Sequence, residues 1–306
     1  GYGLRSEEPA EATGTSEGDE RQALLGKNRR VAREPYGANT AAALRRDWAE
    51  EGRGIITSRA DLEAFPWPDP EEYTCAKAFA ETAAALPPGM KIVAYQGHIF
   101  TPVWQMMGFE TFCFALRDDP ALVEALFERI GSLQLAILER VVQFPQVAAV
   151  WFPDDIAYTE GLMLAPSVFR RYLFPWLRRM GEACAARDLP WIYHSDGDLT
   201  EVIEDLIDCG VNALHPIEAK AMDIVALKKR YAGRLALMGN LDLAYPLSLG
   251  TPAEVAAEVK RLLREVAPGG GYCLGSGNSV PEYVPLANYE AMRLTALEYG
   301  RYPIRV

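Results

Sequence analysis

The chain has 306 residues, of which 49% are hydrophobic, and a formal net charge of −11. This length suffices for one large domain or two ordinary ones. The negative charge argues against nucleic acid and anionic membrane surfaces as partners, because both would repel the chain. The sequence has no apolar run long enough to span a membrane, and residues 1–20 are too polar and acidic for a signal peptide. Five scattered cysteines without a CxxC pair favour a reducing, cytoplasmic location.

The N-terminal part lacks the regular pattern of the rest. Residues 4–20 (LRSEEPAEATGTSEGDE) have no aromatic residues, and residues 21–52 are rich in Arg and Ala without a clear strand. The segment 65–70 (FPWPDP) is a rigid proline connector. We expect residues 1–20 to be a flexible acidic segment and residues 21–306 to form a single domain.

Six short apolar runs follow the connector, at 91–94, 147–152, 190–193, 211–214, 235–238 and 272–274. Helix patterns separate them, with start signals such as Asp118-Asp-Pro120 and Thr251-Pro252. Apolar strands that alternate with helices predict a parallel sheet covered on both faces. The spacing favours an α/β fold of the (β/α)8 TIM-barrel type over an open sheet.

The strand count falls short of a closed barrel, which needs eight strands. Only 54–57 and 302–306 offer further candidates, and both are weak. The first 50 residues contain no convincing first strand. We therefore expect an atypical or incomplete N-terminal part of the barrel.

Each apolar run ends in polar residues, and a parallel sheet would bring all of these to one edge. The clusters are Gln96/His98, Asp154/Asp155, His194/Asp196/Asp198, His215, Asn240/Asp242 and Ser276/Asn278. Taken singly, each has a structural explanation, such as a turn, a helix cap or a buried, satisfied side chain. Their convergence is the functional signal.

The sequence from His194 to Asp198 (HSDGD) is the most informative of these clusters, because the chain has only three histidines. Next comes the pair Asp154-Asp155. Adjacent residues at a strand end point to opposite sides, so one carboxylate can face the barrel axis while the other caps or pairs. A partly enclosed carboxylate can act as an acid or base, or hold a cation. Glu160, on the following loop, is a further candidate, with a surface position as the alternative.

These residue types also suggest a metal. His194 and Asp196 leave the same strand end, and Cys273 lies in the last apolar run. A His–Asp–Cys site with one open position would suit catalytic zinc. The alternative for Cys273 is a small buried hydrophobic residue.

The region from about Gly97 to Arg301 resembles the uroporphyrinogen decarboxylase superfamily. The landmarks that carry the resemblance run in order: GHIFTPVWQMMG at 97–108, FPDDIAY at 152–158, HSDGD at 194–198, GNLD at 239–242 and LGSGNSVP at 274–281. The resemblance implies a (β/α)8 barrel with its active site at the C-terminal strand ends. It also implies substrate contacts by residues in these segments, namely His98, Trp104, Asp154, Tyr158, Asn240, Asp242, Ser276 and Asn278.

Two branches of this superfamily differ in chemistry. Uroporphyrinogen decarboxylases need no cofactor, but the family's Gly-His-Gly is here Gly275-Ser276-Gly277, and its Phe-Ser-Asp first-strand motif is missing. The zinc-dependent methyltransferases carry His-x-Cys plus a later Cys. Here His194 matches the His and Asp196 replaces the first Cys. Cys273 lies at a plausible spacing for the second Cys.

The resemblance thus implies a zinc-dependent methyltransferase or O-demethylase that acts on a small molecule with a corrinoid protein or a thiol. His194, Asp196 and Cys273 would hold zinc, with Asp155 or Glu160 as a further ligand or acid/base group. One alternative is a cofactor-independent decarboxylase of a porphyrinogen or other cyclic carboxylate, with Asp155 and His194 as acid/base groups. Another is a non-catalytic small-molecule binding protein. A homodimer is also expected.

Overall fold

The computed structural model describes residues 54–70 and 76–306, all within one compact unit, Ala49–Val306. The predicted segment 1–20 lies outside the described residues, so the predicted domain division stays a prediction. Among the described residues, no helix is both long and apolar enough to cross a membrane.

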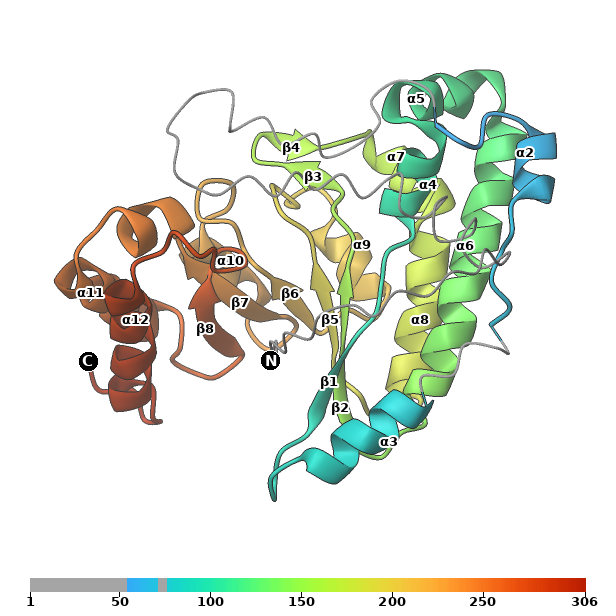
Figure 1. Cartoon of the computed structure of the whole chain (residues 1–306). Coiled ribbons are helices and arrows are strands. Elements are labelled where there is room, and N and C mark those ends of the chain that lie inside the picture. The colour runs from blue at the N-terminus through green and yellow to red at the C-terminus, as the bar shows by residue number, and fades with distance from the viewer. Residues whose placement is uncertain (1–53, 71–75) are drawn as a thin grey trace, which may run out of the picture. The chain divides into compact units, whose positions relative to one another are not determined.

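A curled parallel sheet organises this unit (Figure 1). Its order is β1-β2-β5-β6-β7-β8, and a small antiparallel hairpin of β3 and β4 stands apart from it. The strands are β1 (Ile92–Tyr95), β2 (Val147–Pro153), β3 (Ala157–Tyr158), β4 (Gly161–Leu162), β5 (Trp191–His194), β6 (Ala213–His215), β7 (Ala236–Leu241) and β8 (Tyr272–Ser276). Each of the six predicted apolar runs contributes one strand of the main sheet.

Helices connect the strands and run back along the outer face of the sheet. They are α2 (Arg59–Ala64), α3 (Ala76–Ala85), α4 (Phe100–Met107), α5 (Phe109–Asp118), α6 (Pro120–Val141), α7 (Pro166–Tyr172), α8 (Phe174–Ala185), α9 (Ile203–Asp208), α10 (Ile224–Tyr231), η1 (Leu243–Ser248), α11 (Pro252–Glu265) and α12 (Leu286–Tyr299). The predicted start signals are confirmed: Asp119 caps α6, and Thr251 caps α11 in a capping box with Glu254.

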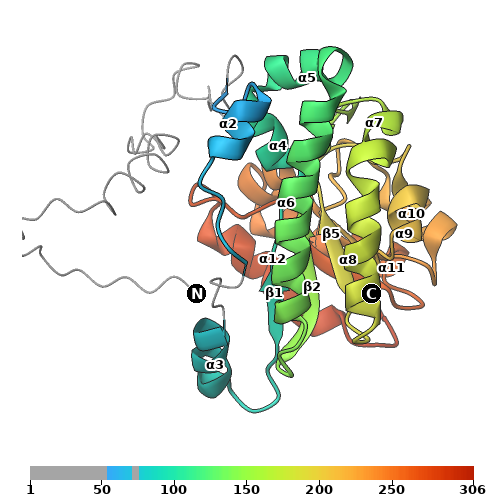
Figure 2. The same cartoon turned by 90° about the vertical axis from the view of Figure 1, so that its right-hand side faces the viewer.

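Helices α6 and α8 lie side by side along the strands (Figure 2). A Cβ at Gly131 of α6 would come within 2.3 Å of the Trp176 ring of α8, so this glycine permits the close approach. The main core forms between these helices and the outward side chains of the strands, such as Phe152 and Tyr193. Apolar burial on this face positions the strand ends.

The opposite, inner face of the sheet is less covered than the sequence predicted. Ala149, Ile192 and Ala213 are buried there, but Val93 and Tyr95 of the edge strand β1 are 53% and 69% exposed. The sheet curls this face toward a barrel axis, and the edge strand β1 has a neighbouring strand on one side alone among the described residues, so its side chains on this face stay exposed.

Neither weak strand candidate forms a strand among the described residues. In the segment 54–57, the backbone N–H groups of Gly54 and Ile56 donate to Met107 and Met106 at the end of α4. A helix end, and not a neighbouring strand, therefore takes the hydrogen bonds of this segment. The described part of the chain thus supplies six barrel strands.

Candidate functional site

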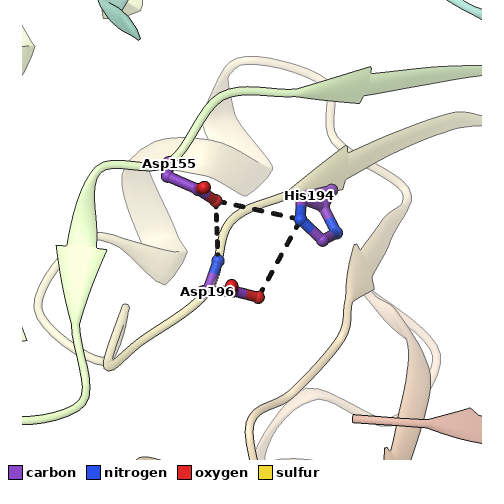
Figure 3. A group of neighbouring side chains, drawn as sticks. All are labelled: Asp155, His194 and Asp196. Atoms are coloured by element: carbon purple, nitrogen blue, oxygen red, sulfur yellow. Dashed lines mark hydrogen bonds and ion pairs between the residues drawn. The ribbon is translucent and has the colours of Figure 1, made fainter. Parts of the chain in front are cut away.

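Three side chains meet where β2 and β5 end (Figure 3). His194 Nε2 lies 3.8 Å from Asp155 Oδ1 and 3.9 Å from Asp196 Oδ1. One ligand atom from each residue lies within 4.8 Å of the other two. Within the described ranges, this is the one group of three His, Cys, Asp or Glu side chains that is so close. We call Asp155, His194 and Asp196 the acidic–histidine cluster.

Asp154 and Asp155 follow β2 and point to different surroundings, as the alternation of a strand predicts. The fully buried Asp154 carboxylate accepts four hydrogen bonds of 2.7–2.9 Å, from the backbone N–H groups of Ile99, Phe100 and Thr101 and from the Thr101 hydroxyl. It therefore holds the start of α4, and burial raises its pKa. Asp155 turns toward His194 instead, and its Oδ1 accepts a 3.0 Å hydrogen bond from Asp196 N.

The loop 195–198 presents Asp196 to the cluster. Gly197 has a φ of +84°, and a Cβ there would lie 2.4 Å from the Tyr158 carbonyl oxygen, so the tight turn requires glycine. The Gly197 N–H donates to Glu218 Oε2 at 3.0 Å, and the Thr159 hydroxyl donates to Glu218 Oε1 at 2.8 Å. Glu218 was not among the residues predicted from the sequence. Its one signal was its position three residues after the end of β6.

Asp196 is the most unusual group of the cluster. Its Oδ2 accepts a 2.7 Å hydrogen bond from Asn278 Nδ2. Its Oδ1 is buried and has no hydrogen-bond partner among the described residues. Burial, together with the negative charge of Asp155, raises the pKa of Asp196 to about 6.

His194 pairs with a second imidazole across the sheet. His194 Nδ1 lies 2.7 Å from His215 Nδ1. The Trp151 ring packs against the His215 ring, with ring centres 4.5 Å apart. Burial lowers the pKa of His194, and the charge of Asp155 opposes this effect. Burial, with the charge of His194, lowers the pKa of His215 to about 3. His98, predicted to contact substrate, lies near enough that its charge also lowers the pKa of His194.

The remaining predicted residues of the first half of the barrel lie apart from the cluster or at its rim. Trp104 packs edge-on against Phe109, with ring centres 5.6 Å apart, beside the main core. Tyr158 is 56% exposed in β3. Glu160 is exposed in the turn between β3 and β4 and is not part of the cluster.

The predicted residues after β7 and β8 mostly hold the backbone. Asn240 is buried, and its Nδ2 donates to the Ile217 carbonyl at 2.9 Å. Asp242 caps η1 by accepting from the Ala244 N–H at 2.7 Å. The Ser276 hydroxyl donates within its own loop. Asn240 and Asp242 also line a cavity of about 760 Å³ beside β7.

The structure does not bring Cys273, the predicted third metal ligand, into the cluster. Cys273 of β8 lies opposite Met238 of β7 in the strand register, and its side chain is exposed. Its strand lies three strand positions from the His194 strand in the sheet order. Asp155 is the third residue of the cluster instead.

The acidic–histidine cluster suits a divalent metal ion. Two carboxylates and one imidazole are ligands that zinc accepts, and they form a harder donor set than one containing thiolates. The buried Asp196 Oδ1 has no hydrogen-bond partner among the described residues, and a cation would satisfy it. Oxygen and nitrogen atoms within 4.8 Å of one another can reach one ion after small side-chain rotations.

Sequence comparison identifies relatives of known family. The chain is 25% identical over 266 residues to the uroporphyrinogen decarboxylase of Azotobacter vinelandii, with 81% of this chain and 72% of the relative aligned. The uroporphyrinogen decarboxylase of a Geobacter species (strain M21) is 28% identical over 247 residues, which cover 75% of this chain and 67% of that protein.

Comparison with solved structures places the fold beside a methyltransferase from Methanosarcina mazei. The TM-score is 0.62 at 19% sequence identity, and the alignment covers 74% of this chain and 64% of the other. The predicted TIM-barrel class is therefore confirmed. The family model described as Uroporphyrinogen decarboxylase (URO-D) matches residues 52–299, most of the chain. The chain belongs to the uroporphyrinogen decarboxylase (URO-D) family.

Proposed function

We propose that this chain is a zinc-dependent methyltransferase or O-demethylase of the family, with Asp155, His194 and Asp196 as the metal ligands. The observation that carries the proposal is Asp196 Oδ1, which is buried, has no hydrogen-bond partner among the described residues, and lies 3.9 Å from His194 Nε2. A carboxylate in this condition is costly unless a cation compensates it. The solved methyltransferase of the same fold supports the reaction class.

The residues of the cluster have separate roles in this proposal. Bound zinc would supply Lewis-acid polarisation of an oxygen or sulfur atom. His194 and Asp196 form the fixed part of the site, because both are partly buried and both have a hydrogen-bond partner that orients them. Asp155 is 51% exposed, so it can swing between ligand and proton acceptor.

The partners follow from the same proposal. The substrate is a small methylated molecule, and the methyl group passes to or from a corrinoid carried by a partner protein, or to a thiol. The four described cysteines are free thiols, which fits a cytoplasmic location. A homodimer stays a prediction.

Metal analysis of the full chain tests this proposal. We expect about one zinc per chain in the purified wild type, and rebinding of Zn²⁺ by calorimetry after removal with a chelator. His194→Ala should bind none. Asp198→Asn is the matched control, because Asp198 lies in the same loop and holds only the turn at Thr200; this variant should bind zinc like the wild type. A wild-type chain that neither contains nor rebinds zinc would contradict the proposal.

A second function is favoured by one specific observation. The pKa of Asp196 is raised to about 6, so a fraction of this carboxyl is protonated near neutral pH and can donate a proton. A cofactor-independent decarboxylase could use Asp196 as the acid, beside the predicted acid/base groups Asp155 and His194. The named decarboxylase relatives support this alternative. Decarboxylation of uroporphyrinogen that persists in excess chelator would favour it over the zinc enzyme.

A further inference from the structure

The contact between His194 and His215 has a chemical consequence for the cluster. These residues are direct partners in the β5–β6 register, and their Nδ1 atoms lie 2.7 Å apart. Their rings are nearly parallel, at 25°, with centres 4.9 Å apart. Trp151 of β2, the strand on the other side of β5, packs against the His215 ring. The sheet thus fixes the distance and orientation of both imidazoles.

A 2.7 Å contact between two ring nitrogens requires one proton between them. If both rings are neutral, either His194 or His215 donates. When His215 donates, the His194 proton sits on Nε2, the atom that faces both carboxylates of the cluster. When His194 donates through Nδ1, its Nε2 lone pair faces the carboxylates instead. Only the second arrangement lets a cation bind at Nε2.

We infer that His215 is a positioning residue for the metal ligand His194: in the metal-bound protein its Nδ1 accepts the hydrogen bond from His194 Nδ1–H. This inference rests on the proposed zinc site. Metal-binding histidines usually donate their second ring N–H to an acceptor that fixes the tautomer and the ring orientation. Here a neutral imidazole from the neighbouring strand replaces the usual carboxylate or carbonyl acceptor.

Zinc affinity of three full-length proteins tests the inference, measured by competition with a chromophoric chelator. His215→Phe keeps the ring packing against Trp151 but removes the acceptor, and we expect its affinity to fall about 10- to 100-fold. His215→Asn places an amide oxygen where Nδ1 was, so it should retain affinity close to that of the wild type. Equal affinity of His215→Phe and wild type would overturn the inference and leave the zinc site intact. Absence of zinc binding in the wild type would overturn both.

A second measurement does not depend on the folding of any variant. The chain has only three histidines, so ¹⁵N-histidine NMR of the zinc-loaded wild type gives a simple spectrum. We expect His194 to carry its proton on Nδ1 and His215 to carry its proton on Nε2. A zinc-loaded His194 with a bare Nδ1, or a His215 protonated on Nδ1, would contradict the inference.

Discussion

Two neighbouring regions at the same edge of the sheet differ in how far the buried oxygens of their carboxylates are hydrogen-bonded. At the start of α4, Asp154 is fully buried and its oxygens accept four hydrogen bonds. In the acidic–histidine cluster, Asp196 buries an oxygen that has no hydrogen-bond partner among the described residues. A satisfied buried carboxylate stabilises the fold, whereas an unsatisfied one costs stability and indicates a ligand. The difference between Asp154 and Asp196 therefore agrees with a structural role for Asp154 and with the ligand role that we propose for Asp196.

Removing Asp154 should have the largest effect on folding. Asp154→Ala leaves three backbone N–H groups and a hydroxyl without their acceptor in the protein interior. We expect the free energy of unfolding to fall by about 3 to 5 kcal/mol. Urea denaturation of the metal-free chain measures it.

The adjacent variant Asp155→Ala is the matched control for Asp154→Ala. Asp155 is 51% exposed, so its loss should change the unfolding free energy by less than about 1 kcal/mol. For zinc binding we expect the opposite order: Asp155→Ala should lose most of its affinity for zinc, and Asp154→Ala should lose less. If the two substitutions destabilise equally, the contrast between the two regions does not hold.

The sequence predicted the fold better than the site. All six apolar runs, which are three to six residues long, formed strands of the main sheet. The segment 54–57 has the same apolar character but did not, because its hydrogen-bond partner is the end of α4. That contact is tertiary, and the local pattern contains no sign of it.

Part of the site could be predicted because parallel strand ends share one edge. That rule predicted that His194, Asp196 and Asp155 share this edge with several other polar residues, and these three do lie together. The role of Glu218 and the exposed position of Cys273 did not follow from it, since spacing along the chain does not reveal which side chains face one another. The Asn278 contact with Asp196 depends in the same way on a loop conformation.

Asn278 holds the Asp196 carboxylate, and we expect its replacement to disturb the fold less than that of Asp154. Its amide donates to Asp196 Oδ2 and thereby orients the free Oδ1 toward His194. Asn278→Ala should weaken zinc binding about tenfold, because hydrogen bonds to a ligand fix its direction. Ser279→Ala, which changes the next and exposed side chain, is the control and should bind zinc like the wild type. Unchanged affinity in Asn278→Ala would show that Asp196 needs no such support.

The smallest expected effect is that of replacing Asp196. Removal of its charge should raise the free energy of unfolding, whereas Asp154→Ala should lower it. Burial raises the pKa of Asp196 from its ordinary value of 3.8 to about 6 in the folded chain. Above pH 6 the carboxylate is ionised in both states, and the native state carries the full cost of burying the charge. Asp196→Asn should therefore stabilise the metal-free protein at pH 8, by about 1 kcal/mol after solvent screening of a side chain that is 35% exposed.

The stability difference between Asp196→Asn and the wild type should depend on pH. Between pH 6 and 3.8 the folded state binds the Asp196 proton and the unfolded state does not, so the wild type gains stability as the pH falls through this window. The advantage of Asp196→Asn should shrink accordingly, as urea denaturation of both metal-free proteins at pH 8 and pH 5 would measure. Added Zn²⁺ should then stabilise the wild type and leave Asp196→Asn unchanged. If Asp196→Asn is less stable than the wild type at pH 8, Asp196 is a satisfied structural acid like Asp154.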